Sequence, residues 1–196
     1  QFSQRPELKN YSYSIFWDQG GIIQGSINNV MLSGMWGGLF AFTILFIFLK
    51  RFWITSIITL AIPLSLLITL LVMYFIGWTL NLITMMGMMI SIGMVVDNAI
   101  VITENIYRLN GSGFPIKKSA IWGASEVGLA ITLSTLTTIV VFLPMMLMSG
   151  DSEMSFLLVR IGLPVIIALL SSLTIALVLI PLSTTVIPQP HNTISH

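Results

Sequence analysis

The chain contains no cysteine, and only 8% of its 196 residues are charged. The lack of cysteine excludes disulfide bonds and thiolate metal sites, although it does not identify a compartment. The scarcity of charge excludes an ordinary soluble domain, in which about 25% of residues are charged. The formal net charge is +1 and there is no basic run, so we expect no nucleic-acid partner.

Motifs that would predict an enzyme are missing as well. The sequence has no glycine-rich phosphate loop, no HExxH zinc motif and no nucleophile elbow. The two histidines, His191 and His196, lie at the C-terminal end and support no site. We therefore expect a protein that is not an enzyme, has no cofactor and does not draw its energy from ATP.

What the chain has instead is long apolar runs, since 56% of its residues are hydrophobic. The runs are about 20 or more residues long, enough for a helix to cross about 30 Å of hydrocarbon. The predicted fold class is therefore all-α, a polytopic membrane bundle of five transmembrane helices over residues 30–186. The predicted helices cover residues 30–50, 54–77, 80–108, 121–148 and 156–186.

Short polar segments flank the predicted bundle. Residues 1–29 carry several charges, and the alternation in residues 11–15 predicts a short strand. This head is too short to be an independent domain. The chain starts at Gln1 without a signal peptide, so we expect a piece of a longer protein. Residues 187–196 are predicted to be a tail in the cytoplasm.

The basic residues predict an orientation. The positive-inside rule makes the side that carries most lysine and arginine cytoplasmic. The head and the acidic loop at residues 149–153 then lie outside. The basic residues that share the inner side are Lys50, Arg51, Arg108, Lys117 and Lys118.

Arg160 does not fit this pattern, because it lies near the outer end of the fifth span. Its side chain could snorkel to the interface. It could also pair with Asp151 or Glu153, and the sequence leaves these alternatives open.

One acid lies deep inside an apolar span. Residues 82–102 contain a single ionisable group, Asp97. A carboxylate at that depth costs about 2.5–3.5 kcal/mol on insertion scales, and such acids usually serve ion or proton movement inside a bundle. At about 100° per residue, one narrow stripe of this helix holds Gly93, Asp97, Ile100 and Glu104.

We expect this stripe to face a neighbouring helix, because two small residues, Gly87 and Ser91, are expected nearby and small residues allow close approach. There the surroundings would decide whether the Asp97 carboxyl group is charged or neutral, as a proton carrier requires. The alternative is that Asp97 only fixes helix packing. For Glu104, about one turn from Arg108, a relay role and a structural role are both open.

A row of hydroxyl side chains marks the fourth span. Hydroxyls at membrane depth often bond to carbonyl groups of their own helix, which is the interpretation that we favour. The alternative is a path for water or protons beside Asp97, formed by Ser134, Thr135 and Thr138. The row consists of Thr132, Ser134, Thr135, Thr137 and Thr138.

Methionine is abundant, with 12 residues, several of them just before Asp97. Thioethers can bind Cu(I), but methionine is also a flexible packing residue. Since neither histidine nor cysteine accompanies these residues, we expect no metal site.

Residues 93–105, GMVVDNAIVITEN, resemble the fourth transmembrane helix of resistance–nodulation–division (RND) efflux permeases. Other segments resemble the same family in the same order. Residues 48–51 (FLKR) resemble the end of the second helix, 62–65 (IPLS) the third and 77–84 (GWTLNLIT) the start of the fourth. Residues 142–144 (FLP) resemble the outer part of the fifth helix, and 17–19 (WDQ) the strand leaving a periplasmic porter domain.

The resemblance implies a proton-driven pump of twelve transmembrane helices in the bacterial inner membrane, with a role in multidrug resistance. The chain would hold helices two to six of the first half, and residues 1–29 would be the end of a porter domain. The implied partners are the lipid bilayer, the rest of the permease with its second helical half, a homotrimer, a periplasmic adaptor and an outer-membrane channel.

One departure from the family concerns the acid site. The family often has two adjacent acids at the centre of this helix, whereas here Asp97 is followed by Asn98. Asparagine cannot titrate, so Asn98 is expected to hydrogen-bond the partner that a second acid would meet. The implied relay is then Asp97, Asn98 and Glu104. Heavy-metal members usually have a small residue after the acid, so organic substrates are favoured.

Three functions stay open. The first is proton/substrate antiport that expels drugs or other amphiphiles, with Asp97 as carrier. The second is a related role in protein export or lipid handling, and the third is a sensor or scaffold of the same fold in which Asp97 is structural. Residues 98–101 (NAIV), followed by Glu104 and Asn105, favour the first.

Overall fold

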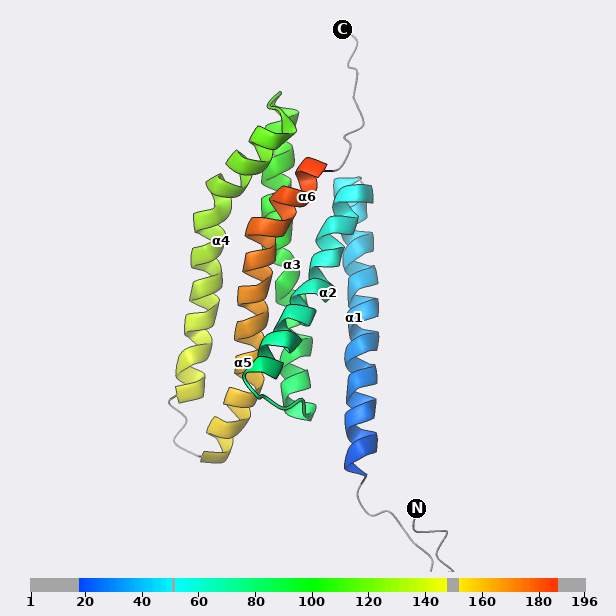
Figure 1. The fold of residues 1–196 in the computed structure, drawn as a ribbon, viewed down its shortest axis with the longest axis vertical. Coiled ribbons are helices and arrows are strands. Elements are labelled where there is room, and N and C mark those ends of the chain that lie inside the picture. The colour runs from blue at the N-terminus through cyan, green and yellow to red at the C-terminus, as the bar shows by residue number, and fades with distance from the viewer. Residues whose placement is uncertain (1–17, 51, 148–151, 187–196) are drawn as a thin grey trace, which may run out of the picture.

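The apolar runs of the sequence form long helices that alternate in direction along the bundle (Figure 1). The computed structural model describes residues 18–50, 52–147 and 152–186. Within these ranges five helices are long and apolar enough to cross a membrane, which confirms the predicted all-α bundle. The elements are α1 (Gln19–Leu49), α2 (Phe52–Phe75), α3 (Leu82–Gly111), α4 (Ile116–Leu147), α5 (Ser152–Thr174), a π-helical turn η3 (Ile175–Leu179) and α6 (Ile180–Val186).

Helix α1 begins at Gln19, well before the span predicted from residue 30. Asp18 is the reason, because its carboxylate oxygen Oδ1 accepts a hydrogen bond of 2.9 Å from the amide of Gly21 and caps the helix. The predicted strand at residues 11–15 and the predicted tail at 187–196 lie outside the described residues. No strand occurs within the ranges that the structure describes.

The last span is one rod made of three elements. The amide of Ile180 bonds to the carbonyl of Ile175, five residues back, which is the π-helical pattern. Pro181 follows immediately and has no amide hydrogen to give to the preceding turn. A local change of helical pitch absorbs this loss, and the apolar span continues through residues 153–186.

Helix α3 is the centre of the bundle and contacts all four of the other long helices. Two close approaches set its packing. A side chain at Gly87 would collide with the backbone carbonyl of Ile161 in α5, and one at Gly123 in α4 would lie 2.8 Å from Cα of Ile106 in α3. Helix α1 is peripheral, because only 6% of the residues in its most apolar stretch are buried, whereas 44% of those in the corresponding stretch of α3 are buried.

The two ends of the bundle differ in charge (Figure 1). One end, which we call the basic end, carries the turn at Lys50 and the loop between α3 and α4, with Lys117 and Lys118 next to it. The other end, which we call the Asp18 end, carries the start of α1 and the turn between α2 and α3. The predicted orientation requires this clustering of lysines at one end, while the cytoplasmic assignment of that end stays a prediction.

Candidate functional site

Helix α3 has two faces with opposite surroundings. The buried face packs against the other described helices, whereas the stripe with Gly93, Asp97 and Glu104 is exposed. No hydrogen bond or ion pair reaches the Asp97 carboxylate from the described part of the chain. Asp97 therefore points to a side of the bundle that none of these helices covers. The buried polar residues of α3 are Thr84, Ser91, Asn98, Thr103 and Asn105.

The expectation that Gly87 and Ser91 flank the Asp97 stripe is wrong. Both residues are buried, and Gly87 lies against Ile161 of α5. At about 100° per residue, the six positions from Ser91 to Asp97 put them about 120° apart around the helix. The small residues thus serve the contact with α5, and the described helices provide no tight contact for Asp97.

Asn98, next to Asp97, lies on the buried face and joins α3 to α4. Its amide nitrogen Nδ2 donates a hydrogen bond of 3.2 Å to Oγ1 of Thr135, which also lies 3.4 Å from the Asn98 oxygen Oδ1. Within the described residues Asn98 thus bonds the Thr135 hydroxyl, while the expectation that it meets the partner of a second acid stays a prediction. Both side chains are buried, so this polar pair is shielded from lipid.

A second polar contact ties α5 to the same turn of α3. The hydroxyl of Ser172 donates to the backbone carbonyl of Val95 at 2.6 Å. No specific sequence signal predicts this contact, because a serine in an apolar span most often bonds within its own helix. The Asn98–Thr135 contact with α4 and the Ser172–Val95 contact with α5 thus fix the helical turn of α3 that carries Asp97.

The hydroxyl row of α4 divides into two kinds of residue. Thr132, Thr137 and Thr138 donate to carbonyl groups four residues back, at 2.7, 2.8 and 3.1 Å, as the favoured interpretation predicts. Thr135 is buried against α3. Ser134 is exposed, so the three candidate path residues do not share one environment.

At the basic end, Arg108 pairs with Glu126, to which the sequence patterns assign no role. Its guanidinium group forms a salt bridge of 3.0 Å with Glu126 of α4, and no bond to Glu104 is present in the described residues. The Asn105 oxygen Oδ1 accepts from Arg108 at 2.7 Å, and its Nδ2 donates to Glu126 and to the Gly123 carbonyl. Glu126 is the only acidic residue in the predicted fourth span, residues 121–148, and this position could have marked it as a partner for a basic residue.

Arg160 at the Asp18 end has a partner that none of the open alternatives included. Its guanidinium carbon lies 4.7 Å from the ring centre of Trp78 and 4.9 Å from that of Phe156. One of its nitrogens also donates to the Thr79 hydroxyl at 3.3 Å. Cation–π contacts of this kind join α5 to the turn before α3. Asp151 lies outside the described residues.

Metal ligands do not gather in the described ranges, where no group of three histidine, cysteine, aspartate or glutamate residues could hold an ion. Met85 and Met88 are buried among apolar side chains, as packing residues are. The chemistry available at the site is thus that of one carboxyl group on an uncovered helix face, next to a shielded amide–hydroxyl pair.

Comparison with known proteins agrees with this architecture. The model of the AcrB/AcrD/AcrF family matches residues 6–196. The swarming motility protein SwrC of Bacillus subtilis is 36% identical over 181 residues, which are 91% of this chain and 17% of SwrC. The multidrug resistance protein MdtC of Pectobacterium atrosepticum is 34% identical over 160 residues, 81% of this chain and 16% of MdtC. MdtC of Pantoea ananatis is 34% identical over 174 residues, 89% of this chain and 17% of that protein.

Proposed function

The chain belongs to the AcrB/AcrD/AcrF family of RND transporters, and on this premise we propose that it forms the helical core of the first half of a proton-driven efflux permease. The chain spans about one sixth of the length of the relatives named above, 17% of SwrC and 16% of one MdtC. Membrane transport by efflux is the function of the family, and the multidrug resistance of MdtC supports drugs or other amphiphiles as the exported compounds.

Asp97 is proposed as the proton carrier, and its position on the uncovered face of α3 is the observation that supports this role. A carboxylate at membrane depth requires a partner, and the described helices offer it neither a cation nor a hydrogen bond. The rest of the permease would cover this face and supply that partner. The carboxyl group could then be neutral or charged according to how close the partner lies.

Asn98 and Glu104 have different roles in this proposal. Asn98 does not face the Asp97 side, because it is buried against Thr135. It positions α4 relative to α3 and carries no proton. Glu104 shares the exposed stripe with Asp97, two turns closer to the basic end, where it could pass a proton toward the cytoplasm.

The proposed assembly follows from the same family. The permease would work in the bacterial inner membrane as a homotrimer with a periplasmic adaptor and an outer-membrane channel. The polar residues before α1 would continue into a periplasmic porter domain. The protein would carry no cofactor and catalyse no chemical reaction.

The test is efflux by the full-length permease that contains this chain, carrying Asp97→Asn. This change keeps size and hydrogen bonding but removes the ability to gain and lose charge. We expect normal insertion and no efflux of a fluorescent drug from energised cells. The control Thr137→Ala changes a hydroxyl that bonds to its own helix and is not a candidate for the proton path, so it should retain efflux. Efflux against a gradient by Asp97→Asn would disprove the carrier role, and the sensor or scaffold alternative would gain support.

A further inference from the structure

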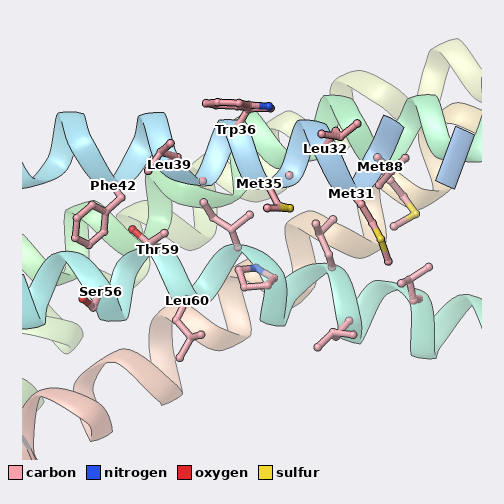
Figure 2. A pocket seen from close by; sticks show the side chains of 18 residues that line it. Met31, Leu32, Met35, Trp36, Leu39, Phe42, Ser56, Thr59, Leu60 and Met88 are labelled. Carbon is pink, nitrogen blue, oxygen red and sulfur yellow. The ribbon is translucent and has the colours of Figure 1, made fainter. Parts of the chain in front are cut away.

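A large apolar groove separates α1 from α2 in the part of the bundle that lies within the membrane. Its volume is about 1060 Å³, and α1, α2 and Met88 of α3 line it. Figure 2 shows Met31 and Met35 reaching from α1 toward α2, with Phe42 and Thr59 near one end of the groove. The proton-relay proposal does not use this groove.

An apolar groove of this size is neither left empty nor filled with water. An empty apolar volume forfeits the dispersion contacts of every atom that lines it. Water needs two to four polar partners, and the only hydroxyls in the lining, those of Ser56 and Thr59, lie close together at the end near Phe42. The remaining lining consists of aliphatic, aromatic, methionine, proline and glycine residues, so hydrocarbon is the filling that matches it.

The shape of the groove selects the kind of hydrocarbon. The two helices diverge from their turn at Lys50 toward the Asp18 end (Figure 1). Toward the turn the groove is closed, because the rings of Phe42 and Phe52 meet edge to face with their centres 5.7 Å apart. A helix that crosses the whole membrane therefore cannot follow the groove, whereas a chain that enters from the Asp18 side and ends near mid-membrane can.

The length of the groove fits a lipid tail. From Val30 to Phe42 it covers thirteen residues of α1, and the twelve steps between these two residues span about 18 Å at 1.5 Å per residue. Half the hydrocarbon thickness of a bilayer is about 15 Å. The groove also opens onto the exposed surface of the described bundle, since Met31, Leu39 and Leu67 on its rim are exposed.

Polar groups occur where a lipid headgroup would lie. Asn28 is exposed at the open end and precedes Met35 by seven residues, so it shares the groove-facing side of α1. Its side chain can donate to a phosphate or ester oxygen. From these observations we propose that the groove binds one acyl chain of a phospholipid from the leaflet on the Asp18 side, with Asn28 at the level of the headgroup.

The test uses the full-length permease in phosphatidylethanolamine nanodiscs that contain a phospholipid with a photoreactive diazirine in its acyl chain. After irradiation and proteolysis, mass spectrometry locates the label. We expect label on the groove floor, at Leu66 and Leu70, which line the groove and are half-buried, so that lipid that merely surrounds the protein reaches them far less than the rim. Rim residues such as Leu67 should be labelled whether or not an acyl chain occupies the groove.

Two glycines allow the groove to be filled. A Cβ at Gly34 or Gly38 meets no atom within 4 Å, so Gly34→Phe and Gly38→Phe should occupy the groove without a clash. Each should lower floor labelling at least fivefold and leave rim labelling unchanged. Gly25→Phe is the matched control, because Gly25 is equally open in α1 but does not line the groove.

Three results would overturn the proposal. One is an unlabelled floor with a labelled rim, and another is floor labelling that neither filling variant reduces. The third is protection of both floor and rim, which would mean that another part of the permease covers the groove. A size-exclusion profile equal to that of the wild type shows that each variant is still assembled.

Discussion

Asn98 donates a hydrogen bond of 3.2 Å to the Thr135 hydroxyl, and this contact joins α3 to α4 one residue away from the Asp97 carboxyl group. Adjacent residues of a helix point about 100° apart, so one of the two polar neighbours is committed to packing while the other faces the uncovered side. Asn98 thus positions α3 against α4, and Asp97 is the member of this pair that carries an ionisable group.

The first prediction concerns this pair. Asn98→Ala and Thr135→Val should each destabilise the permease, and a double-mutant cycle should give a coupling of about 0.6 kcal/mol, at most about 1.7, as for other hydrogen bonds between membrane helices. Reversible unfolding in mixed micelles measures it. Efflux by Asn98→Ala should be reduced but present; complete loss with normal insertion would mean that Asn98 belongs to the relay.

The second prediction concerns the network at the basic end. Asn105→Ala should lower the free energy of unfolding by about 1–3 kcal/mol, because Asn105 is buried and its loss leaves the backbone carbonyl of Gly123 without the hydrogen bond that Nδ2 of Asn105 donates. Glu126→Gln should cost less, about 0–1 kcal/mol, since the side chains of its salt bridge are 58% and 54% exposed. Glu104→Gln is the control and should not change stability. An Asn105 variant as stable as this control would contradict the network.

The third prediction tests the approach of α3 to α5. Gly87→Leu should disrupt the bundle, because any Cβ at this position collides with the Ile161 carbonyl. Overpacking of this kind typically costs about 1–3 kcal/mol. Gly111→Leu, in the same helix but with open space around it, should fold normally. Equal thermal stability of the two variants would show that α3 and α5 do not pack as described.

The fourth prediction concerns orientation. The chain has no native cysteine, so Ser112→Cys and Glu153→Cys each introduce a single reactive thiol into it. Both positions are exposed, at opposite ends of the bundle. A membrane-impermeant maleimide added to intact spheroplasts should label position 153 and not 112, because the basic end is predicted to be cytoplasmic. Labelling of both from the same side would refute this topology.

The helices were predictable because hydropathy and length depend only on local sequence, and the bilayer fixes the length required. The start of α1 was not, since Asp18 caps a helix that extends beyond the apolar run. Periodicity correctly groups Gly93, Asp97 and Glu104 on one stripe of α3. It cannot say which stripe is covered, because that depends on the helices packed around it.

The partners within the site were harder to predict than its residues. Glu126 lies near the end of its span, where an acid resembles an ordinary interfacial residue, so its pairing with Arg108 was missed. Arg160 has aromatic partners drawn from a turn far away in the sequence, at Trp78. Contacts of this kind follow from the way helices cross, which a single sequence does not encode locally.

A measurement of proton movement tests the role of Asp97 as proton carrier most directly. The full-length permease is reconstituted into proteoliposomes with a pH-sensitive dye inside, and a pulse of substrate is applied under an imposed proton gradient. The wild-type protein and Thr137→Ala should release protons down the gradient when substrate is added, and Asp97→Asn should release none while still binding substrate. Substrate-dependent proton flux through Asp97→Asn equal to that of the wild type would contradict the assignment of Asp97 as the carrier.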